Sequence, residues 1–239
     1  MTLITDVLTR AARQTSVTAP SSWLTATSDE HREIRDDFLL ETVDDVLERL
    51  DLPSPIGAKY TLTGDGSETY TLPSQFKRLQ RDRLAVYDNL LDRPCVPVTE
   101  DGEYTSIKDL GAAGITRYYK LTGYEGNWSI SFYGEPSASV TIDIHYVTTY
   151  WKVSSGGTVG SEFTDPGDVI LLPRRLVESG IVWRWRERKG LDYQAKYMEY
   201  EAQIARLSND VRGRRVVRFA DPGERVRWQD MVPNFIPSS

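Results

Sequence analysis

The chain has 239 residues, of which 39% are hydrophobic and 27% are charged, and its formal net charge at pH 7 is −6. These values are ordinary for a soluble globular protein that buries a sizeable core, and the length allows one domain or two. The acidic balance argues against a dedicated nucleic-acid-binding protein, and no apolar run reaches the roughly 18 residues that a transmembrane helix needs.

Residues 1–55 are predicted to form two helices. The first helix is predicted from apolar residues that share one face, namely Ile4, Val7, Leu8 and Ala11. Its early acid and interrupted apolar pattern argue against a signal peptide. The second helix is expected to begin at the N-cap Ser28 and to end before Leu52-Pro-Ser-Pro. Its apolar stripe consists of Ile34, Phe38, Leu39, Val43, Val46, Leu47 and Leu50.

Residues 56–153 are predicted to form a β-rich insert. Alternating residues on both sides of Gly64-Asp-Gly-Ser predict a hairpin between strands at 60–63 and 70–72. A short helix is expected within 104–112. Further strands are predicted at 84–87, 116–121, 128–133 and 140–147. The last of these strands should have one apolar and one wet face, because Ile142, Ile144 and Tyr146 alternate with polar residues.

Residues 154–210 are predicted to form a loop and a pair of helices. Pro173 fits the first turn of the first helix, and Gly190 is placed to end that helix in a left-handed conformation. Asp192 is placed to begin the second helix. The apolar stripe of the first helix is Leu176, Val177, Gly180, Ile181 and Trp183. That of the second is Tyr193, Tyr197, Tyr200, Ile204 and Leu207. The expected class is α+β, a helical bundle formed by the N- and C-terminal helices with a β-rich insert and an extended C-terminal arm.

Two tryptophans among arginines are candidates for an interface between subunits. Trp183 and Trp185 lie two positions apart and so face roughly opposite sides of a helix. Either both are absorbed by the protein's own core, or one of them reaches a second surface. The neighbouring Arg184, Arg186 and Arg188 offer bidentate partners to carboxylates of another subunit, with acids between Asp29 and Glu48 as plausible partners. DNA contact is the weaker interpretation, because the chain is acidic.

The tail, residues 211–239, combines arginines with large apolar side chains. Its prolines deny it a helix or a central strand. It either folds back on its own domain or becomes ordered on a partner, and its apolar content favours docking. The residues expected to contact the partner are Arg225, Arg227, Trp228, Phe235 and Ile236. Basic residues gather here while acids gather between Asp29 and Asp51, which suits docking, although two solvated faces explain the asymmetry equally well.

No catalytic, cofactor or metal site is predicted. His31 and His145, the two histidines, lack a metal-binding or nucleophile partner at a useful spacing. Cys95 lies outside any cysteine–histidine motif, so packing explains it better than nucleophilic chemistry, and a single cysteine is typical of a reducing cytoplasm. The acids at positions 36, 37, 44, 45 and 48 are better explained by a solvated helix face than by a metal site. An enzyme would require carboxylates that only folding brings together.

The segment from Leu171 to Leu207, which contains LLPRRLVESGIVWRWRERKGLDY, resembles the C-terminal helical pair of the head-to-tail adaptor (connector) proteins of tailed bacteriophages. The stretch YTLPSQFKRL from Tyr70 is similar to a second motif of that family, with Gln75 at the position of the usual acid. Pro20-Ser-Ser-Trp and Trp151 are also similar to features of these proteins. The resemblance covers most of residues 1–210 and does not extend to 211–239.

The resemblance implies a structural virion protein made in the host cytoplasm. Twelve copies would form a ring under the portal dodecamer, join the DNA-filled head to the tail or nozzle proteins, and line the DNA channel. An acidic wall would let double-stranded DNA slide without sequence-specific binding. The residues expected at interfaces are Trp183, Arg184, Trp185, Arg186 and Arg188 with the five tail residues named above, and Gly190 is expected to be the structural joint.

Two alternatives remain open. The protein could be a tail-completion protein one layer below the adaptor ring. It could instead belong to a different class, a hydrolase or carbohydrate-binding domain that uses exposed aromatic residues of the β insert. Those residues are Tyr118, Tyr119, Trp128 and Tyr133.

Overall fold

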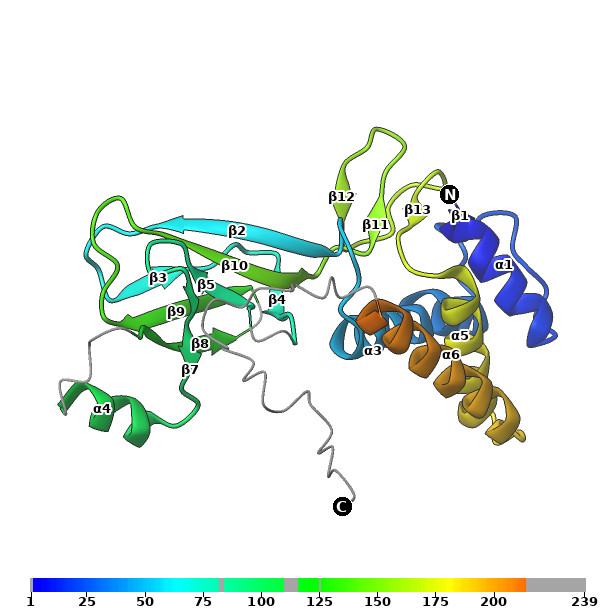
Figure 1. Ribbon diagram of the computed structural model, residues 1–239. Helices are drawn as coiled ribbons and strands as arrows, with labels where there is room; N and C mark the ends of the chain where they lie inside the picture. The colour runs from blue at the N-terminus through cyan, green and yellow to red at the C-terminus, as the bar shows by residue number, and fades with distance from the viewer. Residues whose placement is uncertain (1, 82–83, 110–115, 125, 214–239) are drawn as a thin grey trace, which may run out of the picture.

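The structure, a computed structural model, describes residues 2–81, 84–109, 116–124 and 126–213. Most helices gather at one end of the molecule and two larger sheets at the other (Figure 1). The protein is therefore a mixed α+β protein, as the sequence predicts. Within the described ranges, no helix is long and apolar enough to cross a membrane.

Helices from both ends of the chain share one apolar core. This helical unit consists of α1 (Ile4–Gln14), α2 (Asp29–Arg32), η1 (Glu33–Phe38), α3 (Leu39–Arg49), α5 (Arg174–Arg188) and α6 (Gln194–Gly213). α4 (Asp101–Asp109) lies apart from them, beyond the two larger sheets (Figure 1). The side chain of Ser28 accepts a hydrogen bond from the backbone N–H of His31 and caps α2 as predicted.

The predicted second helix contains a π-helical turn that the sequence analysis did not anticipate. Over η1 the backbone hydrogen bonds widen, and the N–H of Leu39 donates to the carbonyl of Ile34, five residues earlier. The wider turn brings Ile34, Phe38 and Leu39 into the same core, where all three are buried. A regular α-helix would turn residues five positions apart to different sides.

α5 lies at the centre of the helical unit, against α1, η1, α3 and α6. Most of the predicted apolar stripe is buried, but packing on several sides also buries residues outside it. The buried residues are Leu176, Val177, Glu178, Ser179, Gly180, Ile181, Val182 and Trp185. Trp183, which was placed in the stripe, is only half-buried. Pro173 is the N-cap residue, one position before the helix rather than in its first turn.

Two larger sheets face each other across a second core and form, with α4, the β unit. One sheet has the order β2-β10-β5-β6, and β4 also pairs with β10. Its strands are β2 (Gly57–Thr63), β4 (Phe76–Leu79), β5 (Val86–Asp88), β6 (Arg93–Pro94) and β10 (Thr141–Thr148). The other sheet has the order β3-β9-β8-β7. Its strands are β3 (Thr69–Thr71), β7 (Val96–Pro97), β8 (Tyr118–Tyr124) and β9 (Asn127–Tyr133). Along β10, Ile142, Ile144 and Tyr146 are buried, which confirms the predicted alternation.

The predicted hairpin around Gly64 was wrong. β2 pairs with β10, whereas β3 pairs with β9, so the loop after β2 crosses from one sheet to the other. The N–H of Gly64 donates to the carbonyl of Val140, and a Cβ at Gly64 would lie 2.4 Å from the carbonyl oxygen of Pro136. Turn residues mark a change of direction, but burial of both apolar faces decides which strands pair.

A small third sheet joins the N-terminus to the segment that enters α5. Its order is β1-β13-β11-β12. The strands are β1 (Thr2–Leu3), β11 (Lys152–Val153), β12 (Val159–Gly160) and β13 (Val169–Ile170). The N–H of Ile4 donates to the carbonyl of Asp168 over 2.9 Å, so the start of α1 is held beside the strand that leads into α5. Strands of two residues carry no usable periodicity, and the sequence analysis did not predict this sheet.

Candidate subunit and portal interface

The corner between α5 and α6 is built around Gly190, whose φ of +66° lies in the left-handed region. The N–H of Gly190 donates to the carbonyl of Glu187, and that of Leu191 donates to the carbonyl of Arg186. These two bonds satisfy carbonyls at the helix end in the pattern of a Schellman cap. The Asp192 carboxylate then accepts a hydrogen bond from the N–H of Gln194, the first residue of α6. Local chemistry therefore sets the angle of the corner.

The two tryptophans of α5 lie in different surroundings. Trp185 is 9% exposed and belongs to the helical core. The half-buried Trp183 ring lies against three tyrosines of α6, with ring centroids 6.4 Å from Tyr193, 5.2 Å from Tyr197 and 6.2 Å from Tyr200. Both tryptophans therefore pack within the chain, and the contacts of Trp183 hold α6 against α5.

The three arginines in the second half of α5 differ in the contacts that they make within the chain. Arg184 is turned inward, 3.4 Å from the Asp45 carboxylate and 3.6 Å from Glu41, and its guanidinium lies 4.5 Å from the centre of the Trp183 ring. Its acidic partners thus belong to α3 of the same chain.

Arg186 and Arg188 lie nearer the surface. Arg186 donates to the backbone carbonyl of Asp192 over 2.9 Å. Arg188 pairs with Asp37 over 3.4 Å, and both side chains are about half exposed, 49% and 46%. An exposed pair of this kind contributes little to stability, so Arg188 can exchange its partner at low cost.

α6 is also fastened to α3 by two polar contacts. The Tyr200 hydroxyl donates to the Asp45 carboxylate over 2.5 Å, and burial together with this hydrogen bond raises the pKa of Tyr200. Arg49 donates to both oxygens of Glu201 over 2.7 and 2.6 Å, and this pairing lowers the pKa of Glu201. These two contacts hold α6 against α3 and so fix the position of the corner.

Apolar side chains are also exposed at the corner and in the first turns of α6. Leu191 is 48% exposed, Tyr197 38% and Met198 69%. We call Arg186, Arg188, Leu191, Tyr197 and Met198 the corner patch. Exposed apolar groups rimmed by charge are typical of a surface that binds another protein.

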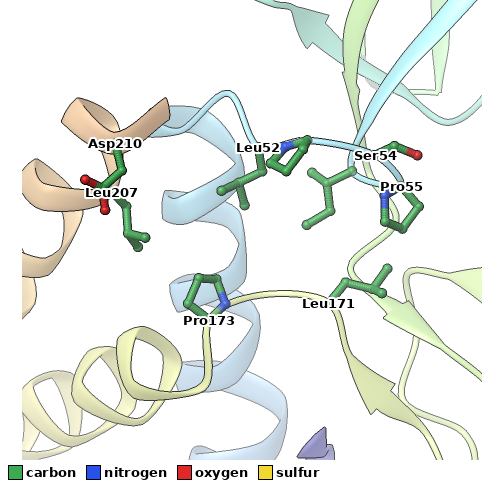
Figure 2. A pocket seen from close by; sticks show the side chains of 9 residues that line it. Leu52, Ser54, Pro55, Leu171, Pro173, Leu207 and Asp210 are labelled. Atoms are coloured by element: carbon green, nitrogen blue, oxygen red, sulfur yellow. The ribbon is translucent and has the colours of Figure 1, made fainter. Parts of the chain in front are cut away.

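A cavity of about 260 Å³ lies at the other end of α6. Figure 2 shows Leu207 and Asp210 of α6 on one side of it, Leu52 and Pro173 next to them, and Pro55 with Leu171 farther along. The wall is mainly apolar. Helix α6 ends at Gly213, so the tail begins close to this cavity.

The sequence of the chain matches the family described as SU10 adaptor protein over residues 2–229. The chain belongs to this family. It is therefore a structural adaptor protein of a bacteriophage and a virion component, in agreement with the resemblance seen in the sequence, and the match extends past residue 210, where that resemblance ended. Membership in a structural family favours a non-enzymatic role. No curated protein matches the chain.

Five of the residues predicted at the adaptor's interfaces, Arg225, Arg227, Trp228, Phe235 and Ile236, lie outside the described residues. The remaining five, Trp183 to Arg186 and Arg188, occur together on the second half of α5. Of these, Trp183, Arg184 and Trp185 make their contacts inside the helical unit, whereas Arg186 and Arg188 lie nearer the surface and belong to the corner patch.

Of the four aromatic residues that a carbohydrate-binding domain would expose, Tyr118 and Tyr133 are partly exposed cross-strand partners, whereas Tyr119 and Trp128 pack against the core between the sheets. Tyr119 is only 8% exposed, and Trp128 is partly buried with its ring centroid 5.9 Å from that of Phe76. Neighbouring residues of a strand point to opposite faces, so Tyr118 and Tyr119 cannot share one exposed surface.

Cys95 and the acidic residues also find structural roles. Cys95 is 4% exposed, and burial raises the pKa of its thiol to about 12, so the thiol stays protonated. Among the described residues, no group of three or more His, Cys, Asp or Glu side chains is placed to hold a metal ion. Acids of the α3 face instead pair with Arg49, Lys77 and Arg184 of the same chain.

Two buried ion pairs support the adaptor fold and were missed in the sequence. Lys152 lies 2.9 Å from Asp168 in the small sheet, and Arg117 lies 2.7 Å from Asp88 in the β unit. Burial opposes ionisation of Asp168, but hydrogen bonds from Lys152 and from the N–H groups of Thr164 and Asp165 outweigh it and lower the pKa. No local spacing signals such pairs, because their partners are brought together by tertiary structure.

Proposed function

We propose that this adaptor forms a ring beneath the portal of a tailed phage and joins the DNA-filled head to the tail. The family match over residues 2–229 carries the proposal. The partners are the portal dodecamer, further copies of the chain in a twelvefold ring coaxial with the portal, and tail or nozzle proteins on the opposite side.

A closed ring requires each subunit to meet its neighbours through two different surfaces. The corner patch supplies one of them, because it combines exposed apolar side chains with cations on a rigid corner. We propose that Arg186 and Arg188 contact acidic groups of a neighbouring subunit or of the portal. Arg184 does not take this role, because Glu41 and Asp45 of its own chain surround it.

We also propose that different segments of the chain have different roles. Residues 1–55 and 154–210 would act as one helical bundle, and residues 56–153 as a β-rich insert carried by it. Residues 221–239 would form an extended arm that anchors the subunit to the portal or to the adjacent subunit through Trp228, Phe235 and Ile236. Arg225 and Arg227 would add charge-assisted contacts beside the tryptophan.

The net charge of −6 supports passage of double-stranded DNA through the ring. A negative wall repels phosphate and lets the duplex slide, whereas a basic wall would retain it. The proposal therefore includes a channel lining without sequence-specific contacts.

The test is binding of the purified full-length chain to purified portal, measured by size-exclusion chromatography with light scattering. The unmodified chain should co-migrate with the portal. Deletion of residues 221–239 should preserve the helix content seen by circular dichroism and abolish co-migration. A truncated chain that still binds portals, or one that unfolds, would refute the anchoring role.

The corner patch is tested by Arg186→Glu. This charge reversal should prevent ring assembly on portals and leave the monomer folded, because repulsion is repeated at each interface. Arg93→Glu, an equal charge change on exposed β6, is the matched control and should assemble normally. Intact rings with Arg186→Glu would count against the patch. Binding to tail proteins without binding to the portal would place the ring one layer lower.

A further inference from the structure

The cavity beside the end of α6 has the form of a site for an apolar side chain. Its walls come from three separate segments: the connection after α3 (Leu52 to Ile56), the entry to α5 (Leu171 to Pro173) and the last turns of α6 (Leu207 and Asp210). Leu52 and Ile56 are buried, whereas Leu171 and Leu207 keep part of their apolar surface exposed. A cavity of about 150 Å³ holds a benzene ring, so about 260 Å³ accommodates one aromatic side chain with a smaller neighbour.

One charged group lies at the edge of this apolar surface. Asp210 is exposed on the last turns of α6, and it forms no ion pair with any residue that the structure describes. The site therefore consists of an apolar cavity with a carboxylate at its edge. A fitting occupant carries a cation and then apolar side chains on one face.

We propose that the chain's own residues 214–219 turn back over this cavity, with Val217 and Phe219 in the apolar hollow and Arg215 at Asp210. The segment reads Arg-Arg-Val-Val-Arg-Phe and follows Gly213 directly. In an extended segment alternate side chains share a face, so Arg215, Val217 and Phe219 point the same way. Their order matches the site, because the cation comes first, next to the helix end.

The reach of the segment is sufficient. Asp210 lies only three residues before Gly213, less than one helical turn away. Phe219 is six residues beyond Gly213, and six extended residues span at most roughly 20 Å. Residues from 221 onward remain free to bind another chain, and the cavity would fix the direction in which they leave the subunit. This inference does not depend on ring formation.

The test is disulfide trapping in the full-length chain with Leu207→Cys in the cavity wall. Combined with Val217→Cys, it should form an intramolecular disulfide in most molecules, seen as a faster-migrating monomer on a non-reducing gel. The matched control pairs Leu207→Cys with Val216→Cys on the opposite face, and its trapping should be lost or much weaker. The native Cys95 stays in place, because its buried, protonated thiol does not react.

Three outcomes would overturn the proposal. Dimers linked through residues 207 and 217 would show that a second copy fills the cavity. Equal trapping at 216 and 217 would show that the segment samples all orientations. Absence of trapping at both positions would show that the segment lies elsewhere, and Trp228→Cys with Leu207→Cys would then show whether the later tryptophan occupies the cavity.

Limited trypsin digestion of the unmodified chain provides a second measurement that needs no substitution. The bonds after Arg214, Arg215 and Arg218 should be cut more slowly than those after Arg225 and Arg227, as determined by mass spectrometry. In Asp210→Arg this protection should be lost. Equal cutting at all five arginines in the unmodified monomer would contradict docking of residues 214–219.

Discussion

The helical unit and the β unit are each supported by one buried ion pair, but the two pairs are completed differently. In the β unit, one oxygen of Asp88 accepts bonds from the N–H groups of Leu90 and Leu91, and the other accepts from Arg117. Beside the helical unit, a single oxygen of Asp168, Oδ2, accepts hydrogen bonds from Lys152 and from two backbone N–H groups. Its other oxygen is buried without a partner among the described residues.

The difference reflects what each pair connects. One oxygen of Asp88 closes the turn after β5, and the other pairs with Arg117, which precedes β8 of the other sheet, so this pair joins the two larger sheets. Asp168 also accepts the N–H of Ile4 on its backbone carbonyl, so it joins the start of α1 to the strand before α5. We therefore expect substitutions at this contact, and at the close crossing of the helices, to have larger effects than substitutions at exposed positions of the β unit.

The largest effect is expected for Gly180→Val at the crossing of α5 and α3. A Cβ at Gly180 would lie 2.2 Å from Cγ2 of Thr42 and 3.1 Å from the Tyr200 ring, so the helices would have to separate. We expect a loss of about 3 kcal/mol or more in the free energy of unfolding, measured by urea denaturation. Gly102→Ala in exposed α4, where a Cβ meets nothing within 4 Å, is the control and should be neutral or slightly stabilising. A stable Gly180→Val protein would refute the close packing.

A comparable loss is expected for Lys152→Met, which leaves the Asp168 carboxylate buried without its cation. Removing one member of a buried pair costs about 3 kcal/mol. Because the folded-state pKa of Asp168 is lowered, its contribution is complete above its unfolded pKa of about 3.9 and is lost as pH falls through the folded value. The variant should therefore lose less stability than the unmodified chain upon acidification.

Lys59→Met provides the matched control for that experiment. It removes the same side chain from a pair with Asp143 in the β unit, where Lys59 is 50% exposed. We expect a change of about 0–1 kcal/mol, measured by the same denaturation curves at several pH values. Equal losses in the two variants would remove the distinction between the units.

Gly190→Val should have an intermediate effect at the α5–α6 corner. A β-branched residue is disfavoured at φ +66°, and we expect a loss of about 1–2 kcal/mol together with a changed corner angle. Gly190→Asn should recover much of the stability, because asparagine tolerates the left-handed region. An unchanged melting temperature with valine would show that the corner backbone is assigned wrongly.

The smallest effect distinguishes two glutamates of the helical unit. Burial raises the pKa of Glu178, so its ionised form lowers stability at neutral pH, and Glu178→Gln should raise stability at pH 7. This gain should vanish as pH falls below about 4, where Glu178 is protonated in both states. Glu201→Gln should have the opposite sign at pH 7, because Arg49 lowers the pKa of Glu201. The same sign for both variants would contradict this interpretation.

Local signals account for the parts of the structure that could be predicted. Ser28 caps a helix through its own neighbours, and the Gly190 cap forms within six residues of chain. Side-chain periodicity was sufficient for α1, for the apolar stripe through α3 and for the faces of β10.

Contacts between distant residues account for the errors. The turn at Gly64 was recognisable, but its strands pair with β9 and β10, which lie far along the chain. Likewise, an arginine-rich helix and an acid-rich helix were each visible, yet composition cannot show whether Arg184 meets Asp45 of its own chain or of a neighbour. Only the packing of α3 against α5 decides that question.

The central proposal is tested most directly by native mass spectrometry of the full-length chain mixed with the purified portal dodecamer. A ring adaptor should give a complex whose added mass equals twelve copies, with no abundant complexes of intermediate number once the ring closes. A chain that stays monomeric beside intact portals, or binds them at other ratios without saturating at twelve, would contradict the adaptor ring.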